Sequence, residues 1–119
     1  VASDTSGVGT ARENLAAAGY GTDKAIFGYG RAYSSSYYST TNKVSNTGVV
    51  ASDTSGVGSA REKLAAAGYG TDKAIFGYGA YTSSYYSTTN KVSNTGVVAS
   101  NTTGVGSARK GLAAASYGN

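Results

Sequence analysis

The chain has 119 residues, which allows one domain at most, and it contains no His, Cys, Met, Pro or Trp. Without His or Cys it offers no Ser/His or Cys/His nucleophile, no zinc site of the usual kind and no disulfide. Ten Lys and Arg against six Asp and Glu give a formal net charge of +4. We therefore expect no enzymatic activity, no catalytic or metal-binding residue and no cofactor.

The positive charges are scattered along the chain rather than gathered in a stripe. A nucleic-acid binder usually carries a dense basic patch, and no apolar run approaches the ~20 residues of a membrane helix. We expect a solvated mixed surface with neither nucleic acid nor membrane as partner. The cations are Arg12, Lys24, Arg31, Lys43, Arg61, Lys63, Lys73, Lys91, Arg109 and Lys110.

The sequence is an internal repeat, which we treat as a single repeat domain over residues 1–119. Repeat 1 spans 1–49, repeat 2 spans 50–97, and a partial repeat 3 spans 98–119, with Arg12, Arg61 and Arg109 spaced 49 and then 48 residues apart. The third copy has drifted, as terminal capping repeats do. Because residue 1 opens in the middle of a unit, we expect the chain to be the C-terminal part of a longer protein.

Four extended segments are expected in each unit, and the fourth of them, residues 61–69, is ambiguous. The Thr10/Glu13 and Ser59/Glu62 pairs match a helix capping box followed by Leu-Ala-Ala-Ala and Gly, which favours a short helix. Against it, eight residues make a marginal helix, and Lys110 replaces the Glu in the third copy. We prefer a strand at 64–69 and in the equivalent segment of repeat 1.

The remaining elements follow in chain order. Residues 25–29 form a β-prone run that glycines close, residues 43–45 suit an exposed strand, and residues 49–52 are expected to return after a turn at 46–48. Equivalent strands are expected one repeat away. The glycine pairs around Tyr20 and Tyr29 are interpreted as tight turns and close packing rather than phosphate loops.

Tyrosine and serine are concentrated in residues 31–38 and 80–86, called here the Tyr/Ser segments. They contain the only length difference between repeats 1 and 2, which is typical of surface loops. Tyr gives contact area at low conformational cost and Ser adds hydrogen bonds, so we expect an interaction surface. Subunit packing, contact with glycans of a host surface, and an ordinary surface loop are the three interpretations of these segments. The candidate residues are Tyr33, Tyr37, Tyr38, Tyr81, Tyr85 and Tyr86.

The acidic residues are isolated. Asp4, Asp23, Asp53 and Asp72 lack the spacing of a known calcium loop, and copy three has Asn101 where copy two has Asp53. We interpret these Asp side chains as caps of local turns.

The order of these pieces resembles a kelch-type β-propeller blade. The matching elements are Arg12 with the Leu-Ala-Ala-Ala run, the apolar segment 25–30 that ends in glycines, and the strand, polar turn and return over 42–48. Tyr29 and Tyr78 split the usual glycine doublet, and the usual Trp is missing. The resemblance implies an all-β fold of about two and a half blades.

So few blades cannot close a ring, because propellers need about four to eight. Upstream blades or oligomerisation would therefore have to complete it. A stacked β-solenoid or filament of repeats is the structural alternative.

The amino-acid sequence of the repeat, such as Thr-Asp-Lys-Ala-Ile-Phe-Gly-Tyr-Gly, is also similar to repeats in virion structural proteins of tailed phages, notably those of cyanobacteria. That resemblance implies a tail-fibre, tail-associated or decoration component located in the virion, with copies of itself or other virion proteins as partners. The alternative is an extracellular or cell-surface adhesin, or a lectin-like protein that binds host-surface glycans.

Overall fold

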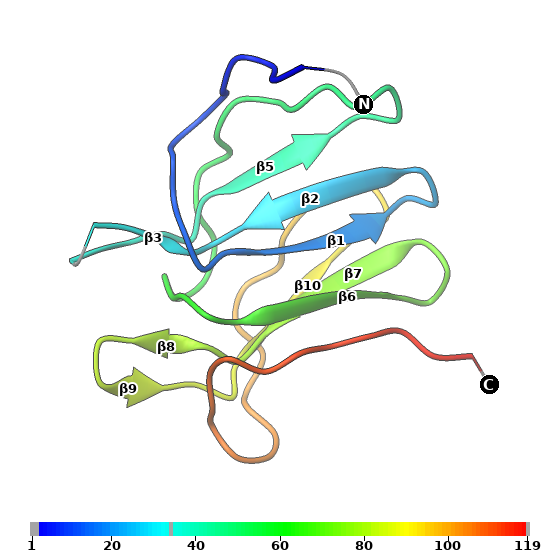
Figure 1. Ribbon diagram of the computed structural model, residues 1–119. Coiled ribbons are helices and arrows are strands. Elements are labelled where there is room, and N and C mark those ends of the chain that lie inside the picture. The colour runs from blue at the N-terminus through cyan, green and yellow to red at the C-terminus, as the bar shows by residue number, and fades with distance from the viewer. Residues whose placement is uncertain (1–2, 34, 119) are drawn as a thin grey trace.

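The computed structural model describes residues 3–33 and 35–118, which form ten β-strands and no helix (Figure 1). The all-β expectation is therefore confirmed. With no helix in this part of the chain, none is available to cross a membrane. The strands are β1 (Ala16–Tyr20), β2 (Lys24–Gly28), β3 (Arg31–Ala32), β4 (Ser36–Tyr37), β5 (Thr41–Val44), β6 (Ala65–Tyr69), β7 (Lys73–Gly77), β8 (Ala80–Tyr81), β9 (Ser84–Tyr85) and β10 (Thr89–Val92).

The strands build the same unit twice. The first sheet has the order β1-β2-β5 and the second has the matching order β6-β7-β10, both antiparallel. A two-stranded hairpin, β3-β4 or β8-β9, accompanies each sheet. The two sheets lie one over the other, with β1 packed against β6 and β7 (Figure 1). The described residues thus form two stacked units without ring closure.

The expected return strand at 49–52 is not a continuous strand. Isolated bridges pair Val44 with Val50 and Thr41 with Thr54, and the pairing shifts by one residue between them, as at a β-bulge. The Asn42 side chain donates to the Ala51 carbonyl oxygen at 3.2 Å, which takes the place of a ladder bond. The sequence pattern predicted a continuous strand here. Because of the bulge, only two isolated bridges form. Repeat 2 has the same bridges, and residues 98–102 of repeat 3 provide its outer edge.

The segment with two possible structures forms strands, β1 and β6. The capping box does not form, because the Thr10 backbone N–H and hydroxyl both donate to the Asp53 carboxylate, at 3.2 and 2.7 Å. Glu13 instead bridges to Arg31 across the hairpin. Long-range pairing therefore overrides the local helix signal, and the prediction of a strand at 64–69 is confirmed by β6.

The core lies between the two sheets and is small. Its buried side chains are Tyr20, Ile26, Tyr29, Leu64, Ala74, Phe76 and Val92. Phe76 meets Tyr29 edge to face, with ring centroids 5.0 Å apart, and it lies over Gly28. A Cβ at Gly28 would come within 2.7 Å of the Phe76 ring, so glycine at this position permits the close approach of the sheets. Sheets with little aliphatic mass can therefore still pack densely.

The glycine that follows Tyr29 is required for a different reason. Gly30 has a φ of 100°, and a Cβ there would lie 2.6 Å from the Glu13 carbonyl oxygen. Gly79 repeats this geometry in the second unit. The interpretation of these glycines as turn and packing residues is confirmed.

Phe76 and Phe27 occupy equivalent positions and provide a matched pair of variants. Phe76 is fully buried between the sheets, whereas Phe27 is 38% exposed on the free side of the first sheet. Phe76→Ala should lower the free energy of unfolding by about 3–5 kcal/mol. Phe27→Ala should cost about 1–2 kcal/mol, since much of its ring is already in water. Urea unfolding of both variants provides the measurement, and equal losses would contradict the assignment of the core.

Candidate functional site

The junction between the two units is centred on a buried arginine. Arg61 has no exposed surface, and its guanidinium donates from Nε to the Tyr78 carbonyl oxygen at 2.6 Å and from Nη2 to Asn90 Oδ1 at 2.8 Å. A third bond runs from Nη1 to the Ser59 carbonyl oxygen at 2.9 Å. The guanidinium also lies 4.6 Å from the centroid of the Tyr29 ring of the first unit. Its charge is therefore met by carbonyl and amide oxygens and by a ring face.

The same arrangement recurs along the chain. Arg12 donates to the Tyr29 carbonyl oxygen at 2.7 Å and to Asn42 Oδ1 at 2.6 Å. Arg109 lies 4.3 Å from the centroid of the Tyr78 ring. The expectation of a solvated mixed surface is wrong for Arg61. The sequence signal that could have indicated this burial was the recurrence of the arginine, at a fixed spacing from a Tyr and an Asn, in each unit.

Burial shifts the titration of the two partners in opposite senses. Desolvation lowers the pKa of the Arg61 guanidinium and raises the pKa of the Tyr29 phenol. The Tyr29 hydroxyl donates to the Val57 carbonyl oxygen at 2.9 Å. The Tyr29 ring thus lies against the Arg61 guanidinium and is anchored at its far end by a hydrogen bond.

An ion pair also crosses the junction. Arg31 Nε lies 3.0 Å from Glu62 of the second unit and 3.1 Å from Glu13 of its own unit. At the equivalent position in the next copy the chain has Ala80 and Lys110, so both members of the pair change together. Lys110 instead lies 5.3 Å from the Tyr85 ring centroid. This paired change avoids setting two cations against each other.

The structure does not gather the six candidate tyrosines into one surface. The rings of Tyr37 and Tyr81 contact each other across the junction at a tilt of 41°, with centroids 4.6 Å apart. Tyr33 is 87% exposed, and Tyr81 and Tyr85 are also exposed. Tyr38 and Tyr86 are half-buried, and their carbonyl oxygens accept from the backbone N–H of Arg61 and Arg109. The Tyr/Ser segments, expected as loops, are short hairpins that partly join the units.

The acidic residues lie apart from one another. Within the described ranges, no three Asp or Glu side chains are placed to hold a metal ion. Asp53 is not a cap of a local turn: it joins Thr10 to Asn42, whose Nδ2 donates to it at 2.8 Å. These hydrogen bonds, from Asn42 and then Thr10, lower the pKa of the Asp53 carboxyl. In the next copy Asn101 makes the corresponding bonds to Ser59 and Asn90.

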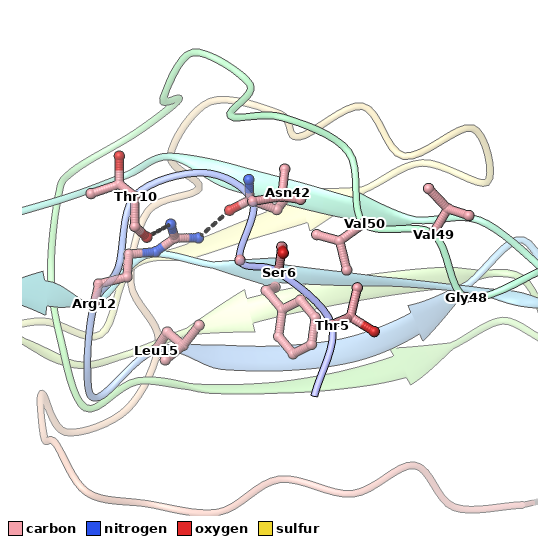
Figure 2. A pocket seen from close by; sticks show the side chains of 12 residues that line it. Thr5, Ser6, Thr10, Arg12, Leu15, Asn42, Gly48, Val49 and Val50 are labelled. Carbon is pink, nitrogen blue, oxygen red and sulfur yellow. Dashed lines mark hydrogen bonds between the residues drawn. The ribbon is translucent and has the colours of Figure 1, made fainter. Parts of the chain in front are cut away.

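A pocket of about 730 Å³ opens on the first sheet (Figure 2). Phe27, which lines the pocket, is the counterpart of Phe76, which the first unit buries against the second sheet. The pocket therefore lies on the equivalent face of the first sheet. Figure 2 shows the hydrogen bonds from Arg12 to Asn42 and to the Thr10 carbonyl oxygen, with Leu15 and Val50 among the other residues that line the pocket. Sequence reasoning did not identify this pocket, whose lining residues, between Thr5 and Val50, are brought together by the fold of the first unit.

Comparison of the chain with protein-family models and with curated protein sequences gives no match. The site is therefore interpreted from its geometry.

Arg61 and Arg109 provide a second matched pair. Arg61→Ala removes a fully buried guanidinium and leaves Asn90 Oδ1 and the Tyr78 carbonyl oxygen without their donor. We expect a loss of about 3 kcal/mol in the free energy of unfolding. Arg109→Ala, at an exposed site, should cost less than about 1 kcal/mol. Chemical denaturation checks both, and a similar small loss in the two variants would show that the junction does not depend on Arg61.

Proposed function

We propose that the chain is a non-enzymatic structural protein of a phage virion, a tail-fibre, tail-associated or decoration component that works through repeat-mediated assembly. One observation carries the assembly part: two nearly identical units bind each other through Tyr29, Phe76 and Arg61. A repeat unit that binds a nearly identical unit can extend into larger arrays. The proposed location in the virion rests on the similarity of the repeat sequence to repeats in phage structural proteins.

Each unit is proposed to be a kelch-like blade. Three antiparallel strands and the bridged outer segment, 50–54 or 98–102, supply four extended segments in the order that such a blade needs. Further blades from an upstream part of the protein or from other copies would close a propeller. A stacked filament of the same units is the alternative arrangement.

The proposed partners are other copies of the chain and other virion proteins. The contact between the Tyr37 and Tyr81 rings supports subunit packing, because it already joins two units. The exposed rings of Tyr33 and Tyr85 favour the alternative function, an extracellular adhesin or lectin-like protein that binds glycans through ring faces. These two pairs of tyrosines therefore separate the two functions experimentally.

The first function predicts that the protein is a stoichiometric component of purified phage particles from its source. Mass spectrometry of those particles and immunogold electron microscopy with an antibody to the chain provide the measurement. Labelling should fall on the tail or on the particle surface. Absence of the chain from purified particles would contradict the virion assignment.

Carbohydrate binding distinguishes the alternative. The wild-type chain should show no saturable binding on a glycan array, and the double variant Tyr33→Ala, Tyr85→Ala should behave in the same way. Saturable binding that this double variant abolishes, with its β-type circular dichroism unchanged, would favour the lectin-like function. Tyr37→Ala is the matched control, since its ring faces the neighbouring hairpin.

A further inference from the structure

We propose that the two ends of the described structure carry complementary halves of the unit-to-unit junction, so that a second copy of the chain docks head to tail. The proposal rests on the proposed function, because it names the surfaces through which the repeat assembles. The head face, on the first sheet, consists of Val8, Arg12, Leu15, Phe27 and Gly48. The tail face, on the second sheet, consists of Tyr69, Ile75, Gly77 and Tyr78.

The phenylalanine and glycine positions show what is missing at each end. In the internal junction Phe76 lies against Gly28, where an added Cβ would be 2.7 Å from the ring. At the head face the equivalent Phe27 is exposed. At the tail face the equivalent Gly77 is buried, but its Cβ position meets only Thr89, at 3.1 Å, and no aromatic ring. Phe27 of one copy therefore matches the position beside Gly77 of another, where no ring lies within 4 Å of the Cβ position.

A second pair of positions repeats this complementarity. Tyr20 is 4% exposed because its ring lies against the turn at Gly96, 2.9 Å from the Cβ position there. The equivalent Tyr69 on the tail face is 39% exposed. The equivalent turn at Gly48 on the head face has no atom within 4 Å of its Cβ position. The turn at Gly48 is thus shaped for a tyrosine such as Tyr69.

The pocket on the head face is the space that a neighbouring unit fills at the internal junction. There Tyr29 reaches between Phe76, Arg61 and the Val57 carbonyl oxygen. The counterparts of those three partners are Phe27, Arg12 and Val8, all of which line the pocket. Tyr78, the counterpart of Tyr29, is the residue of a second copy that fits there.

Docking requires the partial third repeat to give way. Residues 103–117 correspond to residues 6–20 and currently place Arg109 over Tyr78. Residues 113–118 lie outside every sheet and are exposed. Residues 105–111 are held by hydrogen bonds from the Tyr78 hydroxyl to the Val105 carbonyl oxygen and from backbone N–H groups to the Arg109 and Lys63 carbonyl oxygens, and the segment of the second copy has to replace these bonds. The matching segment of a second copy brings β1 with its paired strand β2 and therefore also Phe27. This exchange of equivalent segments resembles domain swapping, and because the faces differ it produces open chains of copies.

Two single substitutions block one face each. Phe27→Asp places a charge on the head face, and Gly77→Ala places a methyl group where the incoming Phe27 ring would lie, at a site where only the Thr89 methyl group, 3.1 Å away, has to shift in the free chain. Val8→Asp is a second head variant on a loop, for use if Phe27→Asp lowers stability. Tyr33→Asp, on the exposed β3-β4 hairpin, is the control. Circular dichroism verifies that each variant keeps its β structure.

Sedimentation velocity over a hundredfold range of concentration measures the association. The wild-type chain and Tyr33→Asp should increase in mass with concentration, while each face variant alone should stay at the mass of one chain. An equimolar mixture of Phe27→Asp and Gly77→Ala should form a dimer and stop there, because only one intact head and one intact tail remain.

Head-to-tail docking and the virion role can fail independently of each other. Wild-type association that neither face variant weakens would overturn the head-to-tail faces and leave assembly through another surface. A wild-type chain that stays at the mass of one chain at every concentration would overturn the inference as well. In either case the presence or absence of the protein in purified particles decides the virion role separately.

Discussion

The position of one tyrosine side chain, Tyr29, determines how the two units fit together. Its ring contacts Phe76 on one side and the Arg61 guanidinium on another, and its hydroxyl reaches the Val57 carbonyl oxygen. Three segments of the second unit are thereby tied to one side chain of the first. The backbone of Tyr29 has a φ of 66°, which costs an L-residue about 1–2 kcal/mol. Burial of the ring offsets that strain.

Small residues make this arrangement possible. The strands β1 and β6 both have the sequence Ala-Ala-Ala-Gly-Tyr, and β1 packs directly against β6 and β7. With so little side-chain volume between them the sheets approach closely, and a few aromatic rings fill the remaining space. A buried cation then takes the place that an aliphatic side chain would hold in a conventional core. Its oxygen partners come from the backbone and from Asn90, so no acidic residue is needed.

Part of the fold could be predicted from the sequence. Strands at 25–29 and 64–69 were predictable because their apolar and small residues recur with glycine and turn signals at both ends. The bulge at 49–54 was not, because it depends on the Asn42 side chain replacing a backbone donor. The capping box failed as a helix signal for a similar reason, since Asp53 is distant in the sequence from Thr10. Local patterns carry no information about such partners.

The candidate site was harder to predict than the strands. The Tyr/Ser segments were found by composition, but which rings pack and which face solvent depends on the hairpins and on the stacking of the units. Arg61 was visible in the sequence only as a marker of the repeat spacing. Its burial follows from the second unit being covered by the first, and the pocket at Phe27 follows from the first unit having no such cover among the described residues.

The central claim is that Tyr29, Phe76 and Arg61 join the two sheets into one cooperative structure. Native-state hydrogen exchange of backbone amides in β2 and β7 tests it most directly, because it reports the free energy of opening for each sheet separately. The account predicts equal opening free energies in the two strands, and an equal decrease in both when Tyr29 is replaced by Leu. Opening of the first sheet with the second still protected, or a decrease confined to β2, would contradict it.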